Sequence, residues 1–201
     1  MAFDYDEATA IPLPGPGLAS DVAEEWADGA AARMAALNDL DDTSTRTLAR
    51  ALARAQRSAA SDPSTNLLLR EPATGAWVPL RLTLADGEPD AVAQRSFLWP
   101  ASILAPRIRV ARSRSLGTGC SSTVLVDDRV AQVRWLFATT GKSFFATLGP
   151  VAPALLAMVA ARVEILLDTV QIGGAPWAPS DHFDPDALSR SGVEPESLWR
   201  I

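Results

Sequence analysis

The stretch FATTGKSFFATLG contains a TGKS tetrapeptide at residues 140–143, which resembles the end of a nucleotide-binding phosphate loop. Such a loop needs a glycine five residues before the Gly-Lys pair, so that successive backbone N–H groups can surround the phosphates. Leu136 stands at that position, and the stretch joins two β-like segments instead of opening a helix. We therefore predict a hairpin turn at Thr140 and Gly141, and no nucleotide site.

Cys120 and His182 have the side chains of a thiol nucleophile and its general base. The cysteine begins a predicted strand, whereas the histidine lies in the C-terminal segment. A buried structural cysteine and a surface histidine are therefore expected. The sequence GTGCSST around Cys120 also lacks the Gly-x-Ser-x-Gly order of a serine nucleophile turn. No catalytic residue is predicted.

Three carboxylates close to His182, those of Asp181, Asp184 and Asp186, could in principle bind calcium. Their segment lacks the alternating ligands, the central glycine and the closing glutamate of a calcium loop. With one histidine and one cysteine, the chain has no ligand set typical of zinc or iron. Neither a metal nor another cofactor is predicted.

Arginines concentrate in the segment RIRVARSRSL, where Arg107, Arg109, Arg112 and Arg114 are candidate residues for binding an anion or a partner. By contrast, residues 1–42 carry ten acidic residues and one arginine. One interpretation is that an acidic helix and a basic sheet face attract each other within one fold. The alternative is a basic patch that stays open for an acidic partner.

A second set of arginines follows helical spacing on the opposite side from the leucines of the same segment. These residues are Arg46, Arg50, Arg54 and Arg57. A solvated or acid-paired helix face is the expected role, and nucleic acid is an unlikely partner because the net charge of the chain is −6.

The composition, with 48% hydrophobic and 21% charged residues among 201, predicts a soluble protein with a single domain. A single cysteine suits a reducing compartment, and the acidic N-terminal sequence lacks a secretory signal pattern, so a cytoplasmic location is expected. Residues 143–161 are uncharged, but Gly149, Pro150 and Pro153 interrupt them. No membrane span is predicted.

Two helices are predicted to position the N-terminal part. Residues 1–20 form an extended leader containing PLPGPG, after which structure should begin. Residues 21–62 form a helical pair, whose first helix covers residues 21–38 and is capped by Ser20 or Asp21. The face of that helix predicted to be apolar consists of Val22, Trp26, Ala30, Met34 and Leu37.

Residues 64–172 are predicted to form an α+β core. NLLLREPATGAWVPLRLTLADG indicates a hairpin, and four further strands follow in meander order. The uncharged stretch then enters a long helix that packs across the antiparallel sheet and ends at Gly173 and Gly174. This order of strands, with a closing helix ending in EILLDTVQI, resembles the PsbP-like fold over residues 64–172. The resemblance implies a small binding or assembly factor and transfers no functional residue.

Residues 173–201 are predicted to be an extended arm rich in proline and aromatic residues. Trp177, Phe183 and Trp199 are its candidate anchors into a groove. The groove belongs either to the arm's own domain or to another chain.

Two functional hypotheses follow. The first is a non-enzymatic protein-binding or assembly module that engages another protein or a copy of itself. The second is an enzyme or small-ligand binder whose cleft, lined by the four arginines from 107 to 114, takes an anionic compound.

Overall fold

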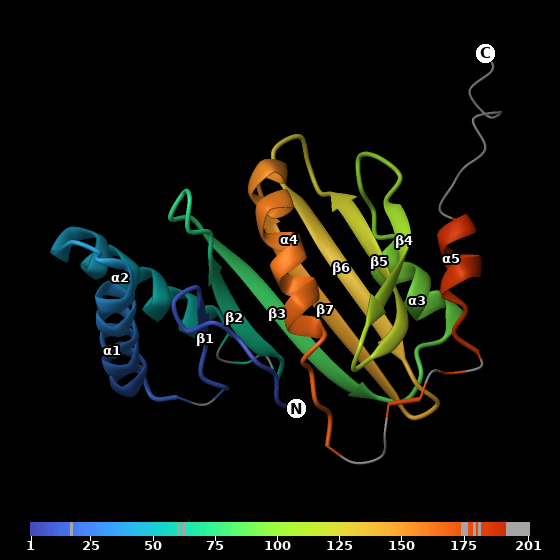
Figure 1. The fold of residues 1–201 in the computed structure, drawn as a ribbon, viewed down its shortest axis with the longest axis horizontal. Coiled ribbons are helices and arrows are strands. Elements are labelled where there is room, and N and C mark those ends of the chain that lie inside the picture. The colour runs from blue at the N-terminus through green and yellow to red at the C-terminus, as the bar shows by residue number, and fades with distance from the viewer. Residues whose placement is uncertain are drawn as a thin grey trace. The chain divides into compact units, whose positions relative to one another are not determined.

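The computed structural model describes residues 1–16, 18–59, 61, 63–173, 177–178, 180 and 182–191. The fold is α+β, as predicted, with a seven-stranded antiparallel sheet in the strand order β1-β2-β3-β7-β6-β5-β4 (Figure 1). The chain divides into two compact units. The smaller unit is Tyr5–Arg81, and the larger unit consists of Met1–Asp4 and the chain from Leu82 onward.

The sheet strands are β1 (Ala10–Pro12), β2 (Thr65–Arg70), β3 (Trp77–Asp86), β4 (Arg107–Ser113), β5 (Gly117–Leu125), β6 (Ala131–Ala138) and β7 (Lys142–Val151). The helices are α1 (Ser20–Asn38), α2 (Asp42–Ala59), α3 (Ala91–Leu98), α4 (Pro153–Leu167) and α5 (Pro185–Ser191). Residues 185–191, within the predicted extended C-terminal arm, therefore form a helix.

The larger unit is built on the predicted meander, because β4, β5, β6 and β7 are successive antiparallel neighbours. The hairpin predicted at Thr140 and Gly141 is confirmed, since Ala138 of β6 pairs with Ser143 of β7. Thr139 Oγ1 accepts the backbone N–H groups of Gly141 and Lys142 at 3.2 and 2.9 Å. These donors face a turn, so they do not form a cradle for phosphate.

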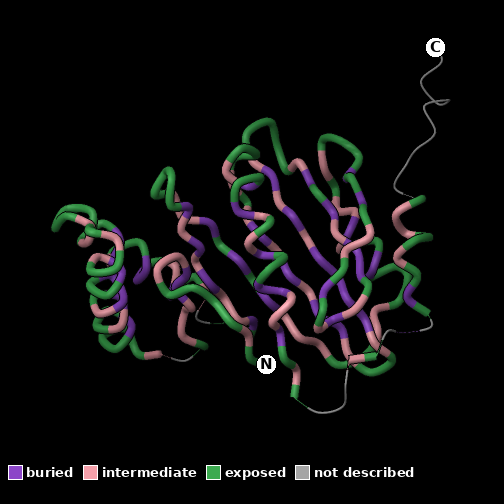
Figure 2. Tube along the Cα trace, in the orientation of Figure 1, coloured by how far each residue is buried: buried purple, intermediate pink, exposed green. Residues whose placement is uncertain are grey.

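Side-chain alternation gives the meander two different faces. Trp135 and Phe137 of β6 line a pocket together with Glu164 and Leu167 of α4, so they belong to the face that α4 crosses. Helix α4 contacts both β6 and β7 (Figure 1). On the other face, a second apolar cluster contains Leu98 of α3, Ile108, Cys120, Leu136, Ala138 and Phe183. Figure 2 shows that the middle strands are largely buried while α4 keeps an exposed outer side.

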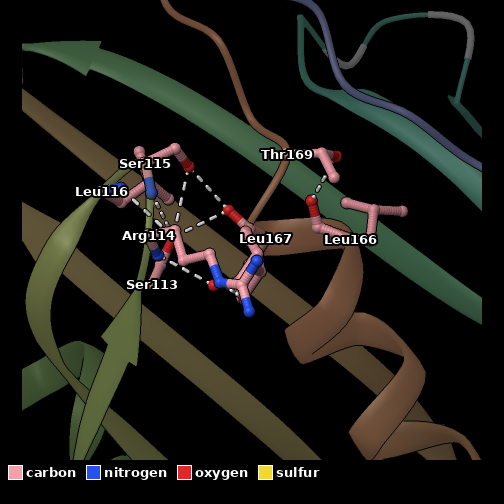
Figure 3. Close-up of polar contacts among 8 residues, drawn as sticks. Ser113, Arg114, Ser115, Leu116, Leu166, Leu167 and Thr169 are labelled. Atoms are coloured by element: carbon pink, nitrogen blue, oxygen red, sulfur yellow. Dashed lines mark hydrogen bonds and ion pairs between the residues drawn. The ribbon is translucent and has the colours of Figure 1, made fainter.

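The C-terminus of α4 is held by the turn between β4 and β5 (Figure 3). The hydroxyls of Ser113 and Ser115 both donate to the carbonyl of Leu167, at 2.8 and 2.9 Å. Thr169 donates to the carbonyl of Leu166. These bonds satisfy carbonyls that have no partner within the helix. They explain why α4 ends at Leu167, before the predicted Gly173 and Gly174.

In the smaller unit, α1 and α2 pack against each other as the predicted pair. The predicted helix at residues 21–38 is confirmed, but Ala19 is its N-cap and no side chain caps it. The predicted apolar face of α1 was wrong at its ends, because Val22 and Leu37 are 44% and 53% exposed. The buried residues are Ala23, Ala27, Ala30, Ala31 and Met34. Alanine allows close approach of α2, so the small residues define the contact face.

Structure begins earlier than the sequence predicted. Ala10–Pro12 forms β1, which pairs with β2 through Ala10 opposite Leu69 and Ile11 opposite Leu68. Proline at the end of an edge strand is compatible with this pairing, because its missing N–H is not needed on the open side.

Gly119 of β5 provides a direct test of the packing in the meander. A Cβ atom there would lie 2.4 Å from the Leu136 carbonyl oxygen and 2.5 Å from Cδ1 of Phe137. We expect Gly119→Ala to lower the free energy of unfolding by about 1–3 kcal/mol, as measured by urea denaturation. Gly141→Ala is the control, since nothing lies within 4 Å of its added Cβ and a change below about 0.5 kcal/mol is expected. Equal stability of both variants would contradict the packing described for β5 and β6.

Candidate functional site

The four predicted arginines lie on or next to β4 but do not act as one cluster. Arg109 and Arg112 line a pocket of about 480 Å³. Arg107 is exposed at the start of the strand. Arg114 lies in the turn after β4 and forms an ion pair with Asp168 at 3.6 Å, while its backbone N–H donates to the same carboxylate. The structure thus brings two of the four arginines to one pocket.

The floor of this pocket is a row of residues that crosses three strands. Arg109 of β4 is opposite Ser121 of β5, and Ser121 is opposite Trp135 of β6. All three residues line the pocket. Directly opposed residues of antiparallel strands project their side chains to the same face. The row therefore belongs to the face that α4 crosses.

The buried end of the row contains an indole group with an unused donor. Trp135 is 1% exposed, and its Nε1 atom has no hydrogen-bond partner among the described residues. Buried indole N–H groups usually find an acceptor. Within the described part of the chain, the side chains of Arg109 and Ser121 also have no hydrogen bond or ion pair. The row therefore combines two pocket-lining polar side chains with a buried indole N–H that has no partner among the described residues.

Helices form the opposite walls of the pocket. Glu164 and Leu167 of α4 lie on one side, and Asp186 of α5 lies on another. Apolar surface comes from Phe137, Val110 and Ala111. The pocket thus places donors on its strand wall, carboxylate acceptors on its helix walls and apolar atoms between them.

The pocket also follows β4, the last strand of the sheet, which α5 contacts. β4 ends the strand order, so no strand among the described residues pairs with its outer side. Four successive residues of this strand, from Arg109 to Arg112, line the pocket. Because successive residues point to opposite faces, the pocket must extend around the edge of the strand. An open edge presents backbone N–H and C=O groups that a further strand can use.

The predicted aromatic anchors lie in three different settings. Phe183 is buried within its own chain, in the cluster with Ile108, Cys120 and Leu136. Trp177 is half-buried, and its Nε1 atom has no hydrogen-bond partner within the described residues. Trp199 lies outside the described residues. Phe183 and Ser180 of the arm therefore pack on their own unit, where the Ser180 N–H donates to the Ala138 carbonyl.

The expected buried cysteine and surface histidine are both found. Cys120 is fully buried, with Sγ 3.6 Å from the carbonyl oxygen of Pro185, and His182 is exposed. Burial raises the pKa of the Cys120 thiol to about 12, and the carboxylates of Asp184 and Asp186 add to this shift. A thiol in this setting is a poor nucleophile.

The remaining motifs have structural partners. Lys142 of the TGKS sequence lies 3.8 Å from an Asp86 carboxylate oxygen, and the Ser143 hydroxyl donates to the Gly87 carbonyl at 2.6 Å. In the described ranges, no three side chains among His, Cys, Asp and Glu are grouped to bind a metal ion. No described helix has the length and apolar character needed to cross a membrane.

The second arginine set is exposed along α2. Arg46, Arg50, Arg54 and Arg57 line a groove of about 420 Å³ together with Glu24 and Asp28 of α1. Arg57 and Glu24 approach to 3.9 Å, and both side chains are more than half exposed. This pattern agrees with a solvated helix face that is partly paired with acids.

Comparison with protein-family models, curated proteins and solved structures found no match. The pocket must therefore be interpreted from its own geometry. Sequence reasoning missed Ser121, Trp135 and Glu164. The one signal for the first two was alternation, because Ser121 and Trp135 occupy equivalent phases in adjacent predicted strands.

The buried thiol leads to a prediction about reactivity. With a pKa of about 12, only about one Cys120 thiol in ten thousand is ionised at pH 8. We expect alkylation by iodoacetamide at pH 8 to be at least about a hundredfold slower in the folded protein than in urea. Intact mass measured over time checks this. Rapid modification without unfolding would contradict the burial of Cys120.

The same shift has a consequence for stability. The folded-state pKa lies above the ordinary value of 9.0, so the thiol favours folding below pH 9. That contribution is lost as the pH rises from 9 toward 12.

Proposed function

We propose that this protein is a non-enzymatic binding module that holds an extended acidic segment of another protein along the outer edge of β4. The observation that carries the proposal is the pocket of about 480 Å³ lined by four successive residues of an edge strand, two of which are arginines. A peptide that adds to a sheet edge gains backbone hydrogen bonds, and the pockets for its side chains determine which peptide sequences bind.

Charge favours another protein over a second copy of this chain. If two β4 edges paired, the arginines of one copy would face those of the other, and like charges opposite each other are destabilising. An acidic segment meets the same edge with opposite charge. The acidic helix walls at Glu164 and Asp186 can accept N–H groups from such a segment.

Two expectations from the sequence agree with the proposal, and a third is its alternative. The resemblance to the PsbP-like fold and the cytoplasmic location agree with a small binding or assembly factor. The alternative of an anionic small molecule in the same cleft uses the same arginines, and the experiments below separate the two.

Binding of a defined peptide tests the proposal. The probe is a fluorescein-labelled decapeptide of alternating valine and glutamate, measured by fluorescence anisotropy at low salt. We expect the double variant Arg109→Glu, Arg112→Glu to weaken binding at least about tenfold, because two attractive charges become repulsive. The matched control is Arg50→Glu, Arg54→Glu, which changes the net charge equally on α2 and should leave affinity unchanged.

The backbone contribution is tested with a second peptide. N-methylation at every second residue removes the N–H groups that would pair with β4 and keeps the charge, so binding should be lost. Strand addition is wrong if the methylated peptide binds as tightly as the parent. If the α2 variant is the one that loses binding, the acidic segment belongs on the helical pair instead.

A further inference from the structure

The smaller unit contains another pocket, of about 320 Å³, between α1 and the chain segment that leads into β1. Its α1 wall includes four of the five residues that the sequence predicted as the apolar face of this helix, namely Trp26, Ala30, Met34 and Leu37. Leu37 is 53% exposed, so part of this apolar face stays outside the core. The predicted face therefore supplies the lining of a pocket as well as core contacts.

The lining of this α1–β1 pocket is apolar and aromatic. Ile11 of β1 and Met34 of α1 are 5% and 2% exposed, and both line it. The partly exposed rings of Tyr5 and Trp26 also line it. Pockets for small molecules combine this kind of lining with a few polar groups. The volume is at the lower end of the range of about 300–1,000 Å³ typical of such pockets, which favours a small ligand.

Two oppositely charged side chains line the α1–β1 pocket without pairing. Arg33 comes from α1 and Glu7 from the turn before β1, and both are exposed. Within the described part of the chain, neither side chain forms an ion pair or a hydrogen bond. An anion would be repelled by Glu7, and a cation would be repelled by Arg33. A ligand that carries both charges can pair with both residues.

The turn that carries Glu7 is tied to α1. The Asp6 carboxylate accepts the Ala8 N–H at 2.9 Å and the Thr9 hydroxyl at 3.1 Å, which fixes the turn itself. Asn38, the last residue of α1, donates to the Ala8 carbonyl at 3.0 Å. The two walls of the pocket are thus joined by hydrogen bonds, and a ligand between them would require little ordering of the backbone.

We infer that the α1–β1 pocket binds a free amino acid with an apolar side chain. The ligand carboxylate pairs with the guanidinium of Arg33, and the ligand ammonium group pairs with Glu7 next to the ring of Trp26. The apolar side chain of the ligand contacts Ile11 and Met34. This site uses none of the residues in the proposed function of β4, so neither proposal depends on the other.

The test compares L-leucine with analogues that each lack one feature. N-acetyl-L-leucine keeps only the negative charge, L-leucinamide keeps only the positive charge, and glycine lacks the apolar side chain. Binding to the full chain is followed by the indole N–H signal of Trp26 in ¹H–¹⁵N spectra, which Trp26→Phe identifies. We expect L-leucine to shift this signal saturably, with a dissociation constant of about 10 µM–1 mM. Each analogue should bind at least about tenfold more weakly.

Variants that remove one charge identify what each residue recognises. Arg33→Gln should weaken L-leucine binding at least about tenfold, because a charge-assisted pair is lost, and should not weaken binding of L-leucinamide. Glu7→Gln should weaken binding of L-leucine and not that of N-acetyl-L-leucine. A variant that only disturbed the fold would weaken every ligand. The matched control is Glu25→Gln, since Glu25 is exposed on α1 outside the pocket lining and its loss should leave L-leucine affinity unchanged.

Four outcomes would overturn the site. One is that L-leucine gives no saturable shift of the Trp26 signal up to about 10 mM. Another is equal binding of L-leucine and the two analogues with a single charge, because the pocket would then be only an apolar surface. Tighter binding of N-acetyl-L-leucine than of L-leucine would show that the ligand is an anion. If L-leucine binds and neither charge variant changes its affinity, the assignment of Arg33 and Glu7 is wrong.

Discussion

Side-chain alternation along the meander is the constraint on which the rest of the larger unit depends. Because each strand projects successive residues to opposite faces, the registers of β4, β5 and β6 decide which residues meet. They place Arg109, Ser121 and Trp135 on the α4 face, and Ile108 and Cys120 with α3 and α5 on the other. A slip of one residue would bury the arginine with the second cluster, so the pocket and the core are fixed by the same pairing.

The hydrogen bonds between the end of α4 and the β4–β5 turn hold α4 close to the paired strands, and this spacing sets the width of the pocket. Ser113 is buried, and its hydroxyl bonds to the last carbonyl of α4, while Asp168 just beyond the helix accepts the Arg114 N–H. The helix wall that carries Glu164 and the strand wall that carries Arg109 are thus joined at one end of β4. This contact also accounts for Arg114, whose side chain pairs with Asp168 and does not line the pocket.

The features predicted correctly from the sequence are those that depend on residues close together in the chain. The hairpin at Thr140 and Gly141 and the meander follow from turn residues and alternating hydrophobicity, which depend on neighbours in the sequence. The face of α1 was wrong because its contact with α2 is made by alanines, whose hydrophobicity is too weak to stand out from Val22 and Leu37. Two residues that line the pocket, Arg109 and Arg112, are among the arginines that the sequence singled out. Arginines can be recognised in a sequence as candidate binding residues because they are charged. Trp135 in VAQVRWLFA has the pattern of any core residue. That its N–H is unpaired among the described residues is evident only in the folded structure.

Open strand edges carry a risk of self-pairing, and the arginines of β4 bear on both that risk and recognition. Natural proteins place charges on edge strands because repulsion prevents two copies from joining. Arg107, Arg109 and Arg112 lie along this edge strand, in a chain whose net charge is −6. A positive edge repels the same edge of another copy, whereas the remaining surface, which is net acidic, repels anions. In the proposed function, this charge distribution directs an acidic segment to β4, where Glu164 and Asp186 limit how much negative charge the pocket accepts. In that proposal, the charges that oppose edge-to-edge pairing of two copies also determine which segment the edge accepts.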